Sequence, residues 1–136
     1  MTFNQVPYTD FNRYIKKYLK EKWQLQWNNS NSKLHRIKPI IEPWPNLSNR
    51  RESVILTRLR IGHTRISHGY LMTKGIPPEC CGTELTVEHF MIKCKKYEDL
   101  RKKYGLPEDL TVLLGPECPK EKIIAYLTET SLINEI

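Results

Sequence analysis

Apolar residues recur at helical spacing in the first part of the chain. Between Asp10 and Trp27 they fall every three or four residues and share one face, namely Phe11, Tyr14, Ile15, Tyr18, Leu19, Trp23 and Trp27. This period predicts an amphipathic helix with Thr9 as its N-cap. We expect its aromatic side chains to be buried in a core and its lysines to be solvated, because large aromatic residues favour burial.

Prolines interrupt the next part of the chain. A polar run at 28–32 is typical of a loop, and Pro39, Pro43 and Pro45 exclude a long helix over 34–47. We therefore expect an extended strap that lies over the helices and is held by apolar side chains. These are Ile37, Ile40, Ile41 and Trp44.

Capping residues mark two further helices. Asn49 followed by Glu52 resembles a capping box, and Gly62 is a typical helix end, so a helix is expected between them. Thr64 is positioned to cap a short helix that reaches Met72.

The remaining segments also favour helices. An irregular turn is expected over 76–85, followed by a helix at 87–94 capped by Thr86 and a charged helix at 95–104 that stops at Gly105. A short helical turn at 107–114 and a last helix from Pro119 complete the pattern. The predicted fold class is therefore mostly α, a small bundle of five or six short helices.

Charge is unevenly distributed over the 136 residues, whose net charge is +7. Residues 1–75 carry 14 Lys and Arg against 4 Asp and Glu, a net +10, whereas 76–136 carry 8 against 11, a net −3. We expect a basic helical part, 1–75, and a second part, 76–136, packed together as one compact domain. A basic half favours contact with a polyanion, although an ordinary solvated lysine surface would have the same composition.

Arginines gather around the predicted helix that ends at Gly62. The planar guanidinium binds phosphate in a bidentate manner, so we take these residues as candidate nucleic-acid contacts. They are Arg50, Arg51, Arg58, Arg60 and Arg65.

Thiol and imidazole groups cluster in the second half of the chain. Cys80, Cys81, His89 and Cys94 follow the spacing C-C-x7-H-x4-C and offer the ligand types that zinc prefers. Because the side chains of adjacent cysteines tend to diverge, the fourth ligand could instead be His63, His68, Cys118 or water. The alternatives are free thiols with a capped His89 and a core Cys94, or, less favoured, a Cys80–Cys81 disulfide. We expect His63 and His68 themselves to have structural roles.

Several classes of protein are not favoured. No apolar run approaches the roughly 18 residues that span a bilayer, and the first residues do not resemble a signal peptide, so we expect an intracellular protein of the nucleus or cytoplasm. The acidic residues of 1–75 form no recognisable cluster for two-metal chemistry, so we expect no enzyme. A zinc nuclease using His63, His68 and His89 is the enzymatic alternative.

Several runs of the sequence resemble one family. The segment RRESVILTRLRIGHT (50–64), then Ser67-His68, LTVEH (85–89) and Cys94 are similar to the region that follows RNase H in Jockey-type non-LTR retrotransposon reverse transcriptase polyproteins. The resemblance extends over nearly the whole chain. It implies a zinc-knuckle-like turn that includes Cys81, His89 and Cys94, whereas the family's first cysteine would fall at Pro78 rather than Cys80.

Two functional hypotheses follow from the charge pattern and the resemblance. The first is a non-catalytic nucleic-acid-binding accessory module that holds RNA or an RNA–DNA hybrid for upstream reverse transcriptase and RNase H domains. The second is a structural or protein-interaction module that packs on those domains. Solvent-exposed aromatic residues on the first helix would favour the second hypothesis.

Overall fold

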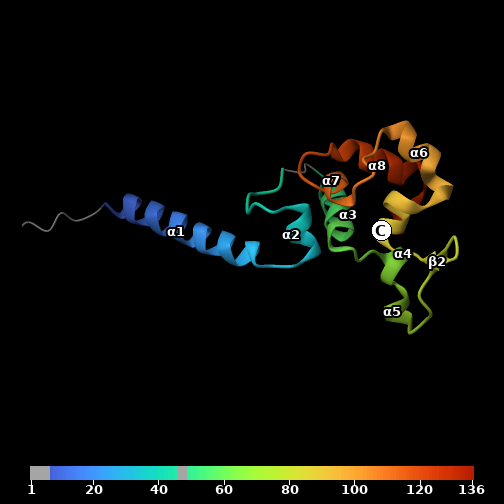
Figure 1. Ribbon diagram of the computed structural model, residues 1–136, viewed down its shortest axis with the longest axis horizontal. Coiled ribbons are helices and arrows are strands. Elements are labelled where there is room, and N and C mark those ends of the chain that lie inside the picture. The colour runs from blue at the N-terminus through green and yellow to red at the C-terminus, as the bar shows by residue number, and fades with distance from the viewer. Residues whose placement is uncertain (1–6, 46–48) are drawn as a thin grey trace, which may run out of the picture. The chain divides into compact units, whose positions relative to one another are not determined.

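The computed structural model, shown in Figure 1, describes residues 7–45 and 49–136. Contacts divide the chain into two units, Met1–Pro43 and Trp44–Ile136. The expected division at residue 75 differs from this one, because both sides of that position belong to the second unit. Part of the strap expected to end at Leu47 lies outside the described residues.

The first unit contains two helices and an extended strap. Helix α1, Tyr8–Asn28, begins after Pro7, two residues before the expected start. Helix α2, Lys33–Ile37, was not predicted, and it forms because the prolines begin only at Pro39 and because the Ser32 hydroxyl caps the amide of His35 at 3.1 Å. The strap, residues 38–43, has no regular structure, as expected.

Side chains of α1 hold the strap through its main chain. The Gln24 amide donates to the carbonyl oxygen of Pro39 and accepts from the amide of Ile41, both at 2.8 Å. The Trp27 indole donates to the carbonyl oxygen of Lys38 at 2.8 Å. The strap therefore runs beside the C-terminal half of α1 in a fixed register.

The expectation that the aromatic face of α1 is buried is wrong. No residue of α1 is buried. The exposed fractions are 53% for Phe11, 68% for Tyr14, 48% for Tyr18 and 59% for Trp23. The spacing of apolar residues correctly indicated an apolar face of the helix. This face stays exposed because, within this unit, only the short strap and α2 are available to cover it.

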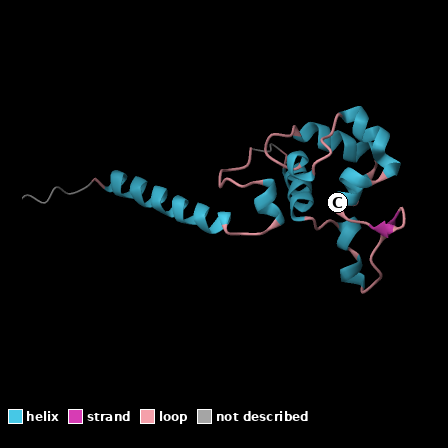
Figure 2. Ribbon diagram, viewed as in Figure 1, coloured by secondary structure: helices cyan, strands magenta, loops and turns pink. Residues whose placement is uncertain are grey.

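The second unit is built from short helices, shown in cyan in Figure 2. They are α3 (Arg50–Ile61), α4 (Arg65–His68), α5 (Tyr70–Thr73), α6 (Glu98–Tyr104), α7 (Leu110–Leu113) and α8 (Lys120–Glu129). The mostly α fold class is confirmed. The described residues hold more helices than expected because α2 was missed and because the helix expected over 64–72 divides at Gly69 into α4 and α5.

Helix α3 begins and ends where the sequence indicated. The Asn49 side chain accepts from the amide of Arg51 at 2.8 Å, and Gly62 ends the helix in the left-handed conformation, with φ 83°. Glu52 does not complete a capping box, because its carboxylate pairs with Lys120 of α8 at 3.5 Å.

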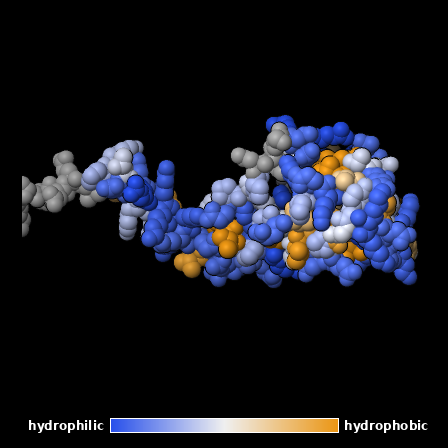
Figure 3. Space-filling model, turned by 90° about the horizontal axis from the view of Figure 1, so that it is seen from above, coloured by the Kyte–Doolittle hydropathy of each residue, from blue (hydrophilic) through white to orange (hydrophobic). Residues whose placement is uncertain are grey.

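Apolar side chains from most elements form the core of the second unit. Helix α3 contributes Ile55, Leu56 and Leu59, and further buried residues follow from the later elements, namely Val87, Phe90, Met91, Leu106, Leu113, Leu114, Ile123, Tyr126 and Leu127. The Tyr126 hydroxyl donates to the carbonyl oxygen of Phe90 at 2.6 Å, so α8 is joined to the segment that carries His89 and Cys94. Hydrophilic side chains cover most of the face in Figure 3.

The described helices include none with the length and apolar character needed to cross a bilayer.

Candidate functional site

A tight β-hairpin presents the first two cysteines. Strands β1, Glu79–Cys80, and β2, Thr83–Glu84, pair antiparallel, with Cys80 opposite Thr83. The two turn residues, Cys81 and Gly82, have φ of 57° and 76°. Positive φ at both positions is the requirement of a type I′ hairpin turn. The expected irregular turn is thus a regular hairpin.

This turn brings the adjacent cysteine sulfurs together. The Sγ atoms of Cys80 and Cys81 lie 3.6 Å apart, and each lies 3.8 Å from Sγ of Cys94. In an extended chain, neighbouring side chains point to opposite faces. Because Cys81 adopts the left-handed conformation at the reversal of the chain, its sulfur turns to the same side as that of Cys80.

A π-helical turn presents the other two candidate ligands. Residues His89–Lys93 form this turn, η1, where an α-helix was expected. Its hydrogen bonds join residues five apart, and the amide of Cys94 donates to the carbonyl oxygen of His89 at 2.7 Å. The Thr86 hydroxyl caps the amide of His89 at 3.1 Å, as predicted. Cys94 is fully buried and His89 nearly so.

The four side chains meet at one point. Their ligand atoms all lie within 4.8 Å of one another, and the group consists of Cys80, Cys81, His89 and Cys94. A tetrahedral zinc site with bonds of about 2.3 Å to sulfur has sulfur–sulfur distances of about 3.8 Å. The observed distances of 3.6 and 3.8 Å match this value. The cluster is compatible with a metal site.

The imidazole of His89 also fits a ligand role. Its Nδ1 lies 3.2 Å from the Thr83 hydroxyl, which fixes the orientation of the ring. Its Nε2 is buried and has no hydrogen-bond partner within the described part of the chain. Because a buried polar atom without a partner is costly, an ion beside Nε2 would satisfy it.

The surroundings of Cys80 favour its protonated thiol. Burial, followed by hydrogen bonds with the side chains of Cys81 and Cys94, raises the pKa of Cys80 to about 11. A cation that takes the Cys80 sulfur as a ligand must therefore displace its proton.

The alternative ligands lie outside this cluster. His63 and His68 stack on each other with ring centroids 3.9 Å apart, and the Ser67 hydroxyl lies 2.7 Å from Nδ1 of His68. The structural role expected of His63 and His68 stays a prediction. Cys118 is not a member of the group either.

Four of the five candidate arginines line one groove, which we call the arginine groove. Arg50, Arg51, Arg58 and Arg65 border this space of about 550 Å³, together with Val54, Ile55, Ile133, Asn134 and Ile136. Arg51 donates to the Asn134 side chain at 2.9 Å, and Arg58 donates to the carbonyl oxygen of Ile136 at 2.6 Å.

Arg60 lies outside the arginine groove. Its guanidinium stacks on the Trp44 ring, 3.6 Å from the centroid, and its Nε donates to the carbonyl oxygen of Leu114 at 3.0 Å. Burial lowers the pKa of Arg60. These contacts join Trp44 to α3 and to the end of α7, so Arg60 has a packing role.

Sequence reasoning missed two features that build the site. The positive φ at Cys81 was signalled only by the following glycine, and the π-turn had no signal in the spacing of apolar residues.

No protein-family model, no curated protein and no solved structure matches this chain.

Proposed function

We propose that this chain is a non-catalytic nucleic-acid-binding module whose second unit is stabilised by one zinc ion. The observation that carries the proposal is the arginine groove, where four guanidinium groups from α3 and α4 border one concave surface. Phosphate groups of RNA or of an RNA–DNA hybrid are the ligands whose charge and geometry such a surface fits.

The donor set supports zinc as the ion. Three thiols and one imidazole at tetrahedral spacing are typical of closed structural zinc sites. Cys80, Cys81, His89 and Cys94 would hold the ion, which would supply a cross-link between the hairpin and the π-turn. Because η1 carries the buried Phe90 and Met91, that cross-link would tie the exposed hairpin to the core.

The walls of the arginine groove are fixed to each other. The amide of Ile66, in α4, donates to the carbonyl oxygen of Glu135 at 2.8 Å. Arg51 and Arg58 each donate one hydrogen bond to the opposite wall, to Asn134 and Ile136 respectively. A guanidinium has five N–H donors. Donors therefore remain for phosphate, and Arg51 and Arg58 are held in place before a ligand arrives.

The test is a titration of labelled single-stranded RNA and of RNA–DNA hybrid at two salt concentrations. Arg50→Gln with Arg65→Gln should weaken binding, and each lost phosphate contact should reduce the salt slope by about 0.7 to 0.9. The matched control is Lys95→Gln with Lys96→Gln, which removes two exposed positive charges outside the groove and should leave the affinity unchanged. An affinity that ignores salt, or an equal effect of this control variant, would contradict the proposal.

A further inference from the structure

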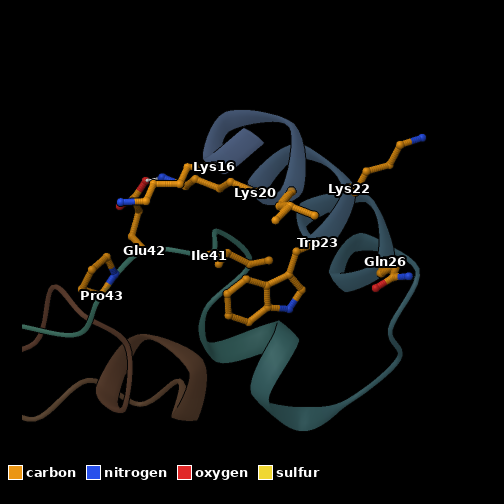
Figure 4. Close-up of a pocket in the computed structure, with 9 residues that line it drawn as sticks. Lys16, Lys20, Lys22, Trp23, Gln26, Ile41, Glu42 and Pro43 are labelled. Atoms are coloured by element: carbon orange, nitrogen blue, oxygen red, sulfur yellow. Dashed lines mark hydrogen bonds and ion pairs between the residues drawn. The ribbon is translucent and has the colours of Figure 1, made fainter. Parts of the chain in front are cut away.

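A second concave surface lies wholly within the first unit. We call it the α1–strap groove, and its walls are the apolar side chains of Leu19, Trp23, Ile41 and Pro43 around about 860 Å³. Figure 4 shows Trp23 and Ile41 beside each other, with Lys16 and Lys20 extending toward Glu42. The proposed nucleic-acid-binding function does not use this surface.

The α1–strap groove is formed before any partner arrives. Gln24 and Trp27 fix the main chain of the strap, as described above, and Lys20 forms an ion pair with Glu42 at 2.6 Å. Binding to such a surface does not require the cost of ordering a loop.

Folding leaves the apolar walls in solvent. Leu19 is 58% exposed and Trp23 is 59% exposed, and the exposed face continues along α1 through Phe11, Tyr14 and Tyr18. A contiguous exposed apolar surface with a polar rim is typical of an interaction site. This is the feature that the protein-interaction hypothesis predicted.

The rim of the α1–strap groove is basic. Lys16, Lys20 and Lys22 border it, and its one lining carboxylate, Glu42, is already paired with Lys20. Residues 7–43 carry 8 Lys and Arg against 3 Asp and Glu, a net +5. Two copies of this surface would repel each other, so a second copy of the chain is disfavoured, whereas an acidic partner is attracted.

We propose that the α1–strap groove docks an acidic amphipathic helix of a partner protein. Aliphatic or aromatic anchors of that helix would cover Leu19, Trp23 and Ile41, and its carboxylates would face the lysine rim. Of the four apolar walls, only Trp23 offers an aromatic ring on which a base could stack, whereas Leu19, Ile41 and Pro43 are aliphatic, so the groove favours protein anchors over nucleobases. The lining residues of α1 run from Lys16 to Gln26, which is about 15 Å of helix and matches about three turns of a partner.

The test uses the full chain and a synthetic helical peptide with leucines at i, i+3, i+4 and i+7 and glutamate at most other positions. Calorimetry should detect saturable binding that weakens as salt increases. Trp23→Ala should reduce the affinity more than about tenfold, which is typical of a central anchor. Lys16→Glu with Lys22→Glu should also weaken binding. All three side chains are exposed, and circular dichroism checks that α1 stays folded.

Matched controls lie on the same helix outside the groove. Leu25→Ala removes an apolar side chain that is 58% exposed, and Lys17→Glu reverses one exposed charge. Neither residue lines the groove, so both variants should bind within about twofold of the wild-type affinity. Equal losses in the controls would show non-specific attraction and overturn the proposal.

Two further outcomes would also overturn it. One is the absence of saturable peptide binding. The other is binding of single-stranded RNA or of phosphatidylserine vesicles that depends on Trp23 and displaces the peptide, which would assign the groove to RNA or to a membrane. Loss of RNA binding in the Arg50 and Arg65 variants concerns only the arginine groove, so the two proposals fail separately.

Discussion

The amide of Cys94 donates a 2.7 Å hydrogen bond to the carbonyl oxygen of His89, five residues earlier in the chain. This bond closes a π-helical turn and places a buried thiol and a buried imidazole on the same side of it. Single π-turns are rare and occur frequently at functional sites. Here the turn supplies half of the cluster, and the hairpin at Cys81 and Gly82 brings the other two sulfurs to it.

Replacing a candidate ligand should remove metal-dependent stability. For Cys94→Ser with zinc present, we expect the free energy of unfolding to fall by more than about 4 kcal/mol, since loss of a metal site belongs to the most destabilising changes. Denaturant unfolding with and without a chelator measures this effect. Cys118→Ser is the matched control, because Cys118 is a free thiol outside the cluster. Similar losses in both variants would contradict the assignment.

The hairpin turn should depend on the residue at position 82. Gly82 has φ 76°, and an added Cβ would meet nothing within 4 Å, so a substitution changes only backbone strain. We expect Gly82→Ala to cost about 1–2 kcal/mol of unfolding free energy and to weaken zinc binding. Gly82→Asn should cost less, because asparagine tolerates the left-handed conformation. If Gly82→Ala loses neither unfolding free energy nor zinc affinity, the turn does not position the cysteines.

Substitutions of Arg60 and Arg50 should have different effects, the first on stability and the second on RNA affinity. Arg60 stacks on Trp44 and donates to Leu114, so Arg60→Gln should lower the free energy of unfolding by about 1–3 kcal/mol. Arg50 borders the arginine groove, so Arg50→Gln should weaken RNA binding and leave stability nearly unchanged. Thermal unfolding and RNA titration on both proteins measure the two effects. The reverse pattern would show that Arg60 is the ligand contact.

The acid sensitivity of the second unit should depend partly on Glu129. Hydrogen bonds from Lys103, at 2.7 Å, and from the Tyr104 hydroxyl lower the pKa of Glu129 below its ordinary value of 4.5. A lowered carboxyl pKa stabilises the folded state above pH 4.5, and this contribution is lost as the pH falls through the folded-state pKa. Glu129→Gln should therefore flatten the pH dependence of stability in that window.

Urea unfolding between pH 3 and pH 7 measures this change. Glu117→Gln removes an exposed carboxylate elsewhere in the second unit and serves as the control. An unchanged pH dependence in Glu129→Gln would show that its contacts with Lys103 and Tyr104 do not contribute.

Local signals predicted most of the helices. The caps at Asn49, Thr64 and Thr86 and the glycine at position 62 act through neighbouring main-chain groups, so the sequence around them is sufficient. The four members of the Cys/His cluster were also predicted from ligand type and spacing, and the structure brings them together.

Features that depend on distant residues were not predictable in this way. Arg60 and Arg58 lie two positions apart on α3, and only the positions of Trp44 and Ile136 decide which one packs and which one borders the arginine groove. The apolar period of α1 indicated a face but not what covers it. The π-turn differs from an α-turn by one residue of hydrogen-bond register, which the spacing of apolar side chains does not resolve.

The most direct test of the metal assignment is the metal content of purified chain together with its cobalt spectrum. Elemental analysis should find one zinc per chain, and cobalt exchanged into the site should show the d–d absorption and sulfur charge-transfer bands of a tetrahedral three-sulfur, one-nitrogen site. The cobalt bands should be lost in Cys94→Ser and retained in Cys118→Ser. A folded chain that contains no zinc and gives no tetrahedral cobalt spectrum would contradict the account.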